Sequence, residues 1–197
     1  MQKSGGVLKG KLKKFHKLIE SLETLPSIGK KSAGRLAFYM VLHSPMDALK
    51  LAHAIEDAVS SIHRCSQCGG LSEDELCYIC SDELRDRTSV CLVESARDIY
   101  VIEESGEYHG LYFVFESLNE RTLESLKEMI KNNDVQEVIF AFTPSMQSDA
   151  TMLYIEDQLQ EFDLHFTKIA QGVPTGVHLE NVDMLSLSKA ISERVKI

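Results

Sequence analysis

The chain has 197 residues, 44% of them hydrophobic and 26% charged, and a net charge of −9. These values are typical of a globular protein of one or two domains and exclude collagen-like and intrinsically disordered classes. The apolar runs are far shorter than the roughly 20 residues that span a bilayer, so we expect no membrane span. The basic amino-terminal segment lacks the apolar region and cleavage site of a secretory signal, so we expect a cytoplasmic protein.

Charge is distributed unevenly along the chain. Residues 1–64 carry a net charge of +6, whereas residues 65–197 carry −15. A cationic segment suits a polyanion, and an acidic one suits a protein partner with a basic surface. The charge pattern therefore predicts two functional surfaces of opposite sign.

The amino-terminal part predicts a helical hairpin followed by a third helix. Apolar residues recur at helical spacing over residues 8–25, with lysines mostly between them. Pro26 ends this helix, and Gly29 provides a tight turn before a second helix over residues 30–43. A third helix is predicted over residues 46–62. Alternatively, the apolar stripe of the first helix packs in the core or in a dimer interface, and its lysines form an ordinary solvated face.

The turn between the first two helices resembles the helix-hairpin-helix motif of proteins that bind DNA without sequence specificity. A glycine turn that opens a helix leaves backbone N–H groups free to bind a phosphate without reading a base. Positive charge in the first helical turn is unfavourable with the helix dipole, a local cost that a bound anion would offset. The predicted DNA-binding residues are Gly29, Lys30, Lys31 and Arg35. The alternative is an ordinary turn between helices.

Four of the five cysteines form two CxxC pairs that are separated by eight residues. Two such pairs can bind one tetrahedral zinc ion through four thiolates, which leaves no open position, so the site would be structural. The predicted zinc ligands are Cys65, Cys68, Cys77 and Cys80. The alternatives are a redox pair, disulfides, or His63 as a ligand in place of one cysteine. The fifth cysteine, Cys91, lies in an apolar run and is expected to be buried in a strand.

From residue 89 onward, apolar runs alternate with helical patterns. Strands are predicted over residues 90–93, 110–115, 135–142 and 165–170, and helices over 96–103, 121–132, 150–162 and 185–195. Short connections and nearly continuous apolar strands predict a parallel sheet with helices packed on it. The predicted fold class is therefore α/β and multidomain, with an amino-terminal helix-hairpin-helix, a small four-cysteine zinc finger, this sheet, and a carboxyl-terminal loop and helix.

Functional groups of a parallel sheet gather beyond the carboxyl ends of its strands. Here Glu94 follows the first strand and Asp149 follows the third. This arrangement resembles the Toprim domain of topoisomerases, primases and some nucleases, in which acids hold magnesium for phosphoryl transfer. No nucleophile or general base accompanies the two acids, which favours a role other than catalysis. The alternative for Glu94 is a capping residue of the next helix.

The ordered motifs, ending in a Gly-Val-Pro-Thr-Gly segment over residues 172–176, are together similar to the RecR family of bacterial recombination mediators. The similarity covers nearly the whole chain. It implies domains at residues 1–64, 65–88, 89–170 and 171–197. It also implies a protein without enzymatic activity that forms ring-like dimers or tetramers and binds single- and double-stranded DNA. Its implied partners are RecO and, in some bacteria, RecF, with which it loads RecA onto single-stranded DNA coated by its binding protein.

At the positions that match the family's motifs, the resemblance implies that Lys31 and Arg35 contact DNA and that the four paired cysteines bind zinc. It also implies that Glu94 and Asp149 form an acidic surface that partners bind. The chain departs from the family pattern in a short loop over residues 116–119, in Gln147 where the family has glutamate, and at the Gly176-Val177 pair. The departure at Gln147 weakens magnesium binding, and magnesium is not expected to be catalytic. The alternative function is a magnesium-dependent Toprim nuclease or primase-like enzyme. The implied location is the cytoplasm, in association with the nucleoid.

Overall fold

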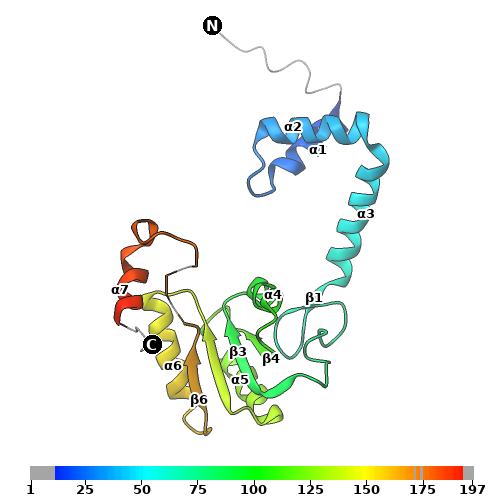
Figure 1. Cartoon of the computed structure of the whole chain (residues 1–197). Helices are drawn as coiled ribbons and strands as arrows, with labels where there is room; N and C mark the ends of the chain where they lie inside the picture. Colours follow the sequence, from blue (N-terminus) through cyan, green and yellow to red (C-terminus); the bar gives the residue numbers. More distant parts are fainter. Residues whose placement is uncertain (1–11, 171, 174, 193–197) are drawn as a thin grey trace. The chain divides into compact units, whose positions relative to one another are not determined.

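The computed structural model describes residues 12–170, 172–173 and 175–192. The chain folds as two compact units, Met1–Ser61 and Ile62–Ile197, each of which is described by itself (Figure 1). The start of the first predicted helix, before residue 12, lies outside the described residues, as does the end of the last predicted helix, after residue 192. No helix in the described ranges has the length and apolar character needed to cross a membrane.

The amino-terminal unit consists of helices α1 (Lys13–Glu23), α2 (Lys30–Phe38) and α3 (Pro45–Ser61), with a π-helical turn, η1 (Tyr39–His43), between the last two. Helices α1 and α2 form the predicted hairpin (Figure 1). Ala33 and Ala37 are fully buried in it, and the half-exposed Phe38 makes an edge-to-face contact with the ring of Phe15 at 4.8 Å. Small buried residues let two helices approach closely, so this hairpin is held by local packing.

The predicted second helix, over residues 30–43, is helical throughout but changes type at Tyr39. The Ser44 amide donates to the Tyr39 carbonyl at 3.0 Å, five residues back, which makes the last turn wider than an α-helical one. Helix α3 then begins at Pro45, where the missing proline N–H costs nothing. None of the 17 residues of α3 is buried within the chain.

The carboxyl-terminal unit contains a parallel sheet of four strands, as the alternating pattern predicted. These strands are β3 (Asp86–Val93), β4 (Gly110–Val114), β5 (Glu137–Ala141) and β6 (His165–Lys168), in the spatial order β4-β3-β5-β6. All three pairings are parallel. Two shorter strands that the sequence did not indicate, β1 (His63–Arg64) and β2 (Leu71–Ser72), pair antiparallel before the sheet.

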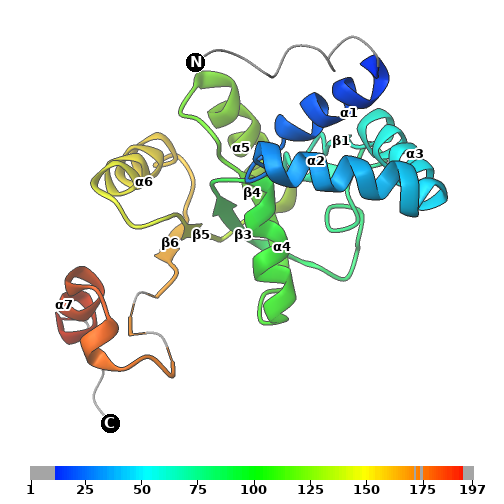
Figure 2. The ribbon, with the colours of Figure 1, turned by 90° about the horizontal axis from the view of Figure 1, so that it is seen from above.

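Three helices connect the strands of the sheet: α4 (Ala96–Ser105), α5 (Glu120–Asn133) and α6 (Met146–Gln158). Right-handed crossovers require α4 on one face and α5 with α6 on the other, because the chain moves in opposite directions along the sheet. Figure 2 shows this arrangement. The direction reverses between β3 and β5, and such a switch point is where open α/β sheets bind ligands, beyond the carboxyl ends of the strands. A short 3₁₀ turn, η2 (Leu179–Asn181), and helix α7 (Met184–Ser192) follow β6.

The core of this unit lies on both faces of the central strands. Val90, Leu92, Leu111 and Val138 are completely buried, and burial of each such side chain contributes about 1.5–3 kcal/mol. Cys91 is buried in β3, which confirms the prediction for it. Burial raises the pKa of the Cys91 thiol to about 12, which leaves it un-ionised and chemically inert near neutral pH.

Helix α6 begins at Met146, four residues before its predicted start at residue 150. Ser145 is its N-cap, with a side-chain oxygen that accepts a hydrogen bond from the Ser148 amide at 3.0 Å. The Ser148 hydroxyl in turn donates to the Thr143 carbonyl at 2.7 Å. These bonds stabilise a first turn whose apolar residue, Met146, is 91% exposed and adds no core packing.

Candidate functional sites

The first candidate site is the start of helix α2. Gly29 is the N-cap, in an extended conformation, and apart from its two chain neighbours no residue comes within 4 Å of the position that a Cβ would take there. The first amides of the helix have no partners inside it, and the absence of a side chain at Gly29 leaves space at the start of the helix. Lys30 and Lys31 occupy this turn and Arg35 lies one turn on, all three exposed.

These three cations form no ion pair with any residue in the described part of the chain, and helix α2 has no acidic residue in its first turn. Positive side chains that are not neutralised locally, beside open amides with the positive end of a helix dipole, create a site for an anion. The geometry suits a phosphate oxygen. Contact with DNA at Gly29, Lys30, Lys31 and Arg35 stays a prediction.

The second candidate site brings together all four paired cysteines. The sulfurs of Cys65, Cys68, Cys77 and Cys80 lie within 4.8 Å of one another, and all four residues are buried. A tetrahedral zinc ion with Zn–S bonds of about 2.3 Å needs sulfurs about 3.8 Å apart, and Cys68 and Cys77 already lie 3.6 Å apart. The donor set therefore fits zinc.

The surroundings of the sulfurs also suit thiolates. The Gly70 amide donates to the Cys68 sulfur and the Cys77 amide to the Cys65 sulfur, both at 3.3 Å. Hydrogen bonding among the clustered sulfurs raises the pKa of Cys68 and Cys80 above that of a free thiol and lowers that of Cys77. One ionised sulfur thus disfavours ionisation of its neighbours, so four thiolates together require a cation.

The first cysteine pair is attached to the end of strand β4. The Val114 amide donates to the Cys68 carbonyl at 2.8 Å. Gly69 has a φ of +75°, and a Cβ there would lie 3.3 Å from the Cβ of Val114, so this turn favours glycine. Arg64 donates to the Gly69 carbonyl at 3.2 Å and to the Glu116 carboxylate at 2.8 Å. No sequence pattern indicates this link, because Arg64 and Glu116 are far apart in the chain.

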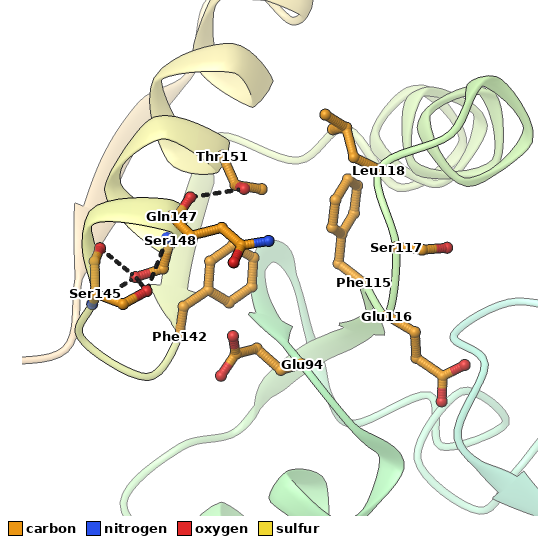
Figure 3. A pocket seen from close by; sticks show the side chains of 10 residues that line it. All are labelled: Glu94, Phe115, Glu116, Ser117, Leu118, Phe142, Ser145, Gln147, Ser148 and Thr151. Carbon is orange, nitrogen blue, oxygen red and sulfur yellow. Dashed lines mark hydrogen bonds between the residues drawn. The ribbon is translucent and has the colours of Figure 1, made fainter.

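The third candidate site is a hollow of about 240 Å³ at the carboxyl ends of β3, β4 and β5 (Figure 3). Glu94 lines it from the end of β3, residues 115–118 from the segment after β4, and Gln147 from the first turn of α6. The Glu94 carboxylate accepts a hydrogen bond from the Thr143 amide at 2.8 Å. The N-cap of α4 is Ser95, not Glu94, so the acid connects two strand ends rather than capping its own helix.

Asp149 does not line this hollow. It lies in the first turn of α6, exposed, beside a separate hollow of about 370 Å³ that Phe140, Phe166 and Lys168 also line. Within the described ranges, the four cysteines are the one cluster of three or more metal-binding side chains. The acidic side chains of those ranges form no such cluster. The structure therefore does not bring Glu94 and Asp149 into one pocket, and the acidic partner surface stays a prediction.

Ser145, at the N-cap of α6, and Ser148 and Thr151, within the helix, also line the strand-end hollow, and of these three, sequence analysis missed Thr151. A serine followed three residues later by a second polar side chain is a capping pattern, and this signal could have located the start of the helix. The helix start in turn determines which side chains face the hollow. Glu116, in the short loop after β4, also lines the hollow, and Figure 3 shows its side chain directed away from Gln147.

Comparison with known proteins gives matches over three consecutive segments. Residues 15–59 match the family model of the RecR helix-hairpin-helix, residues 62–82 match that of the RecR four-cysteine zinc finger domain, and residues 88–170 match that of a Toprim domain. These are the motifs that the sequence predicted, in the same order.

Similar proteins named Recombination protein RecR cover nearly all of this chain. The protein from a Nitratiruptor species is 92% identical over 190 residues, which is 96% of this chain and 100% of that protein. The protein from Campylobacter jejuni subsp. doylei is 53% identical over 186 residues, 94% of this chain and 98% of its own length. The protein from Helicobacter pylori (strain Shi470) is 45% identical over 188 residues, 95% and 97% of the two chains.

Proposed function

The chain belongs to the RecR family of recombination proteins, and from this premise we propose that it is a mediator of recombinational DNA repair. In this proposal it binds DNA without base readout and acts with RecO, and with RecF where present, to load RecA onto single-stranded DNA coated by its binding protein. It works in the cytoplasm, in association with the nucleoid.

The observation that carries the proposal is the cationic start of α2. Open amides after Gly29 bind phosphate oxygens, and Lys30, Lys31 and Arg35 neutralise the backbone charge around them. None of these groups is placed to read a base edge, so the site binds both single- and double-stranded DNA. Such binding releases counterions and becomes weaker as salt concentration rises.

Zinc has a structural role in this proposal, with Cys65, Cys68, Cys77 and Cys80 as its four ligands. A bound zinc ion contributes folding free energy and leaves no coordination position for a reactant. The support is the buried sulfur cluster, together with its attachment through the Cys68 carbonyl to the Val114 amide. The zinc site thereby holds the turn at Gly69 against the end of the sheet.

The acidic carboxyl-terminal unit recruits a basic partner, which we propose to be RecO. Residues 65–197 carry a net charge of −15, and Glu94 and Asp149 are both exposed at the carboxyl ends of the strands. Charge of one sign over a surface accelerates association with a partner of the opposite sign. Because the two acids line different hollows, they serve as separate contact points.

The chain assembles into ring-like dimers or tetramers in this proposal, and helix α3 supplies one interface. Large apolar side chains recur along α3, and all are more than a third exposed: Leu51, Ile55 and Val59. A helix with no buried residue needs another surface to cover its apolar stripe. A second copy of the same helix supplies a matching stripe.

We propose no catalytic role for the Toprim domain. A magnesium site for phosphoryl transfer needs carboxylates that converge on one ion, whereas Glu94 is bonded to the Thr143 amide and Asp149 lies beside another hollow. Gln147 supplies an amide in the hollow that Glu94 lines. The magnesium-dependent enzyme is therefore tested as the competing function.

The test is DNA binding of the zinc-loaded full chain, measured by fluorescence anisotropy with single-stranded and duplex DNA over a range of salt concentrations. Lys31→Ala with Arg35→Ala is expected to weaken binding of both DNAs and to reduce the log–log salt slope by about 0.7–0.9 for each lost phosphate contact. A matched control, Lys50→Ala with Lys127→Ala, removes the same charge from exposed and partly exposed ion pairs elsewhere.

Unchanged affinity and slope in the α2 variant would refute the DNA-binding site. The same titration with purified RecO and magnesium tests the rest of the proposal, because a mediator binds more tightly with RecO and leaves the DNA intact. DNA cleavage that disappears in Glu94→Gln would instead establish the enzyme.

A further inference from the structure

Helix α2 and the turn η1 carry four side chains at intervals of four residues: Lys31, Arg35, Tyr39 and His43. Residues four apart lie on the same helix face, and these four line one open hollow of about 560 Å³ together with Lys30, Gly34 and Phe38. We refer to these four residues as the cation–aromatic stripe. Its first half is cationic and its second half aromatic.

The two rings of the stripe lie against each other and open to solvent. The Tyr39 and His43 ring centroids are 6.1 Å apart with an interplanar angle of 28°, which is a stacked arrangement. Tyr39 remains 57% exposed. Phe38, the neighbouring aromatic residue, also lines the hollow and is 55% exposed, but one edge of its ring contacts Phe15 of α1. The Tyr39–His43 pair is therefore open to a flat ligand, and Phe38 additionally contacts the first helix of the hairpin.

The backbone at this point departs from α-helical geometry. The wide turn closed by the Ser44 amide and the Tyr39 carbonyl contains both rings, and such single π turns occur frequently at functional sites. Gly34, between the cations, has nothing within 4 Å of the position that a Cβ would take. The surface beside Gly34 therefore leaves room for a ligand next to Arg35 and Tyr39.

We infer that Tyr39 and His43 form a base-stacking site for single-stranded DNA, next to the phosphate contacts of Lys31 and Arg35. Proteins that bind single strands without sequence preference combine a cationic track with aromatic platforms, because every base has a flat face. In a duplex those faces are covered by neighbouring base pairs, so only the phosphate contacts remain. The inference rests on the proposed DNA binding by α2 and adds a preference for single strands to it.

Charge favours DNA over a second copy of the chain as the occupant of this hollow. A copy docking through the same face would place its own Lys31 and Arg35 near these cations, and like charges repel. A polyanion with flat apolar bases complements both halves of the stripe. The apolar side chains proposed for self-association lie on α3.

The chain contains no tryptophan, which allows a direct optical test. Tyr39→Trp places a single indole in the full chain at the proposed stacking position. Stacking of a base quenches indole fluorescence, so an oligo-dT strand is expected to quench it strongly. A duplex of equal length, and an abasic strand with the same phosphates, are expected to bind through Lys31 and Arg35 without that quenching. Equal quenching by all three DNAs would overturn the inference.

Affinity gives the second measurement. Tyr39→Ala is expected to weaken binding of single-stranded DNA by about 5- to 100-fold, the size of one lost stacking contact. Duplex affinity should change by less than about twofold, and the salt slope should stay the same, because no phosphate contact is removed. Tyr39→Phe keeps the ring and serves as the control, with binding close to that of the original chain.

The outcomes separate this inference from the function on which it rests. If the original chain binds neither DNA, both fail. If Lys31→Ala with Arg35→Ala weakens binding but Tyr39→Ala leaves single-strand affinity unchanged, the phosphate site stands and the stacking site is refuted. If light scattering shows a smaller oligomer for Tyr39→Ala, then a second copy of the chain occupies this hollow. That result would also refute the stacking site. Because Tyr39 is largely exposed, none of these outcomes depends on a loss of core packing.

Discussion

At the scale of single residues, the space around each glycine decides what a substitution does. Gly110 opens β4 and is buried, and a Cβ there would overlap the ring of Tyr108 and lie 2.8 Å from the Ser89 carbonyl oxygen. The Tyr108 hydroxyl is held by the Leu111 carbonyl at 2.8 Å, so its ring has little freedom to move away. Gly34 has open space around it. The same change at these two positions therefore has opposite effects.

Gly110→Ala is expected to lower the free energy of unfolding by about 1–3 kcal/mol, because overpacking forces backbone shifts in the sheet. Gly34→Ala is the matched control, and there the expected change is a gain of about 0.5–1 kcal/mol from better helix propensity. Urea denaturation followed by circular dichroism measures both. If the Gly110→Ala chain is as stable as the original, then Tyr108 and strand β3 can move to make room for the added methyl group.

At the scale of elements, the zinc site and strand β4 are directly connected. The Val114 amide is bonded to the Cys68 carbonyl, and Arg64 connects the Gly69 carbonyl to the Glu116 carboxylate. The arginine contact is exposed and contributes little, about 0–1 kcal/mol. The hydrogen bond from the Val114 amide to the Cys68 carbonyl and the packing of Gly69 on Val114 are the stronger links. Loss of the metal should therefore reach beyond the cysteines to the end of the sheet.

Chelation of zinc is expected to raise hydrogen exchange over residues 62–82 and at the Val114 amide, because the Cys68 carbonyl loses its fixed position. Amides of β5, such as Ile139 between two neighbouring strands, are expected to keep their protection. Hydrogen exchange with mass spectrometry of the zinc-loaded and chelated chain measures both regions. Protection lost equally in β5 would mean that the whole unit unfolds, and no loss at Val114 would mean that the two elements are independent.

At the scale of the whole molecule, charge and exposed apolar surface distinguish the two units. The amino-terminal segment is cationic and the remainder acidic, which suits one unit to DNA and the other to a basic protein. Helix α3 presents Leu51 and Ile55 to solvent. An apolar stripe on an isolated helix is stabilised by association with a matching stripe. The assembly of chains is therefore expected to depend on this helix.

Ile55→Lys is expected to shift the chain toward a smaller assembly, because it places a charge in the apolar stripe of α3. Asp57→Lys is the control, since its side chain projects about 200° around the helix from Ile55. Size-exclusion chromatography with light scattering measures the mass of both variants. An unchanged mass for Ile55→Lys would exclude α3 as the interface, and an equal shift in both variants would indicate a general charge effect.

The features that the amino-acid sequence determined by itself are those set by short-range spacing. Two CxxC pairs separated by eight residues predict one metal site, and the structure gathers those four sulfurs. Pro26 and Gly29 predict a hairpin, because proline ends a helix and glycine permits a tight turn. Alternating apolar runs and helical patterns predict a parallel sheet with connecting helices. For the cysteine pairs and the hairpin the determining contacts are local and depend on chain spacing. For the sheet, the periodicity predicts the elements, while their pairing joins residues far apart in the chain, such as Val90 and Val138.

Tertiary structure decided which distant residues meet. Glu94 and Asp149 both follow strands, yet they line different hollows, because the early start of α6 at Met146 fixes which of its side chains face Glu94. Arg64 reaches Glu116 only because the zinc site packs on β4. Sheet order and helix rotation set such contacts, and both result from packing over the whole unit. A pattern along the chain therefore predicts which elements form, while three-dimensional packing determines which side chains share a site.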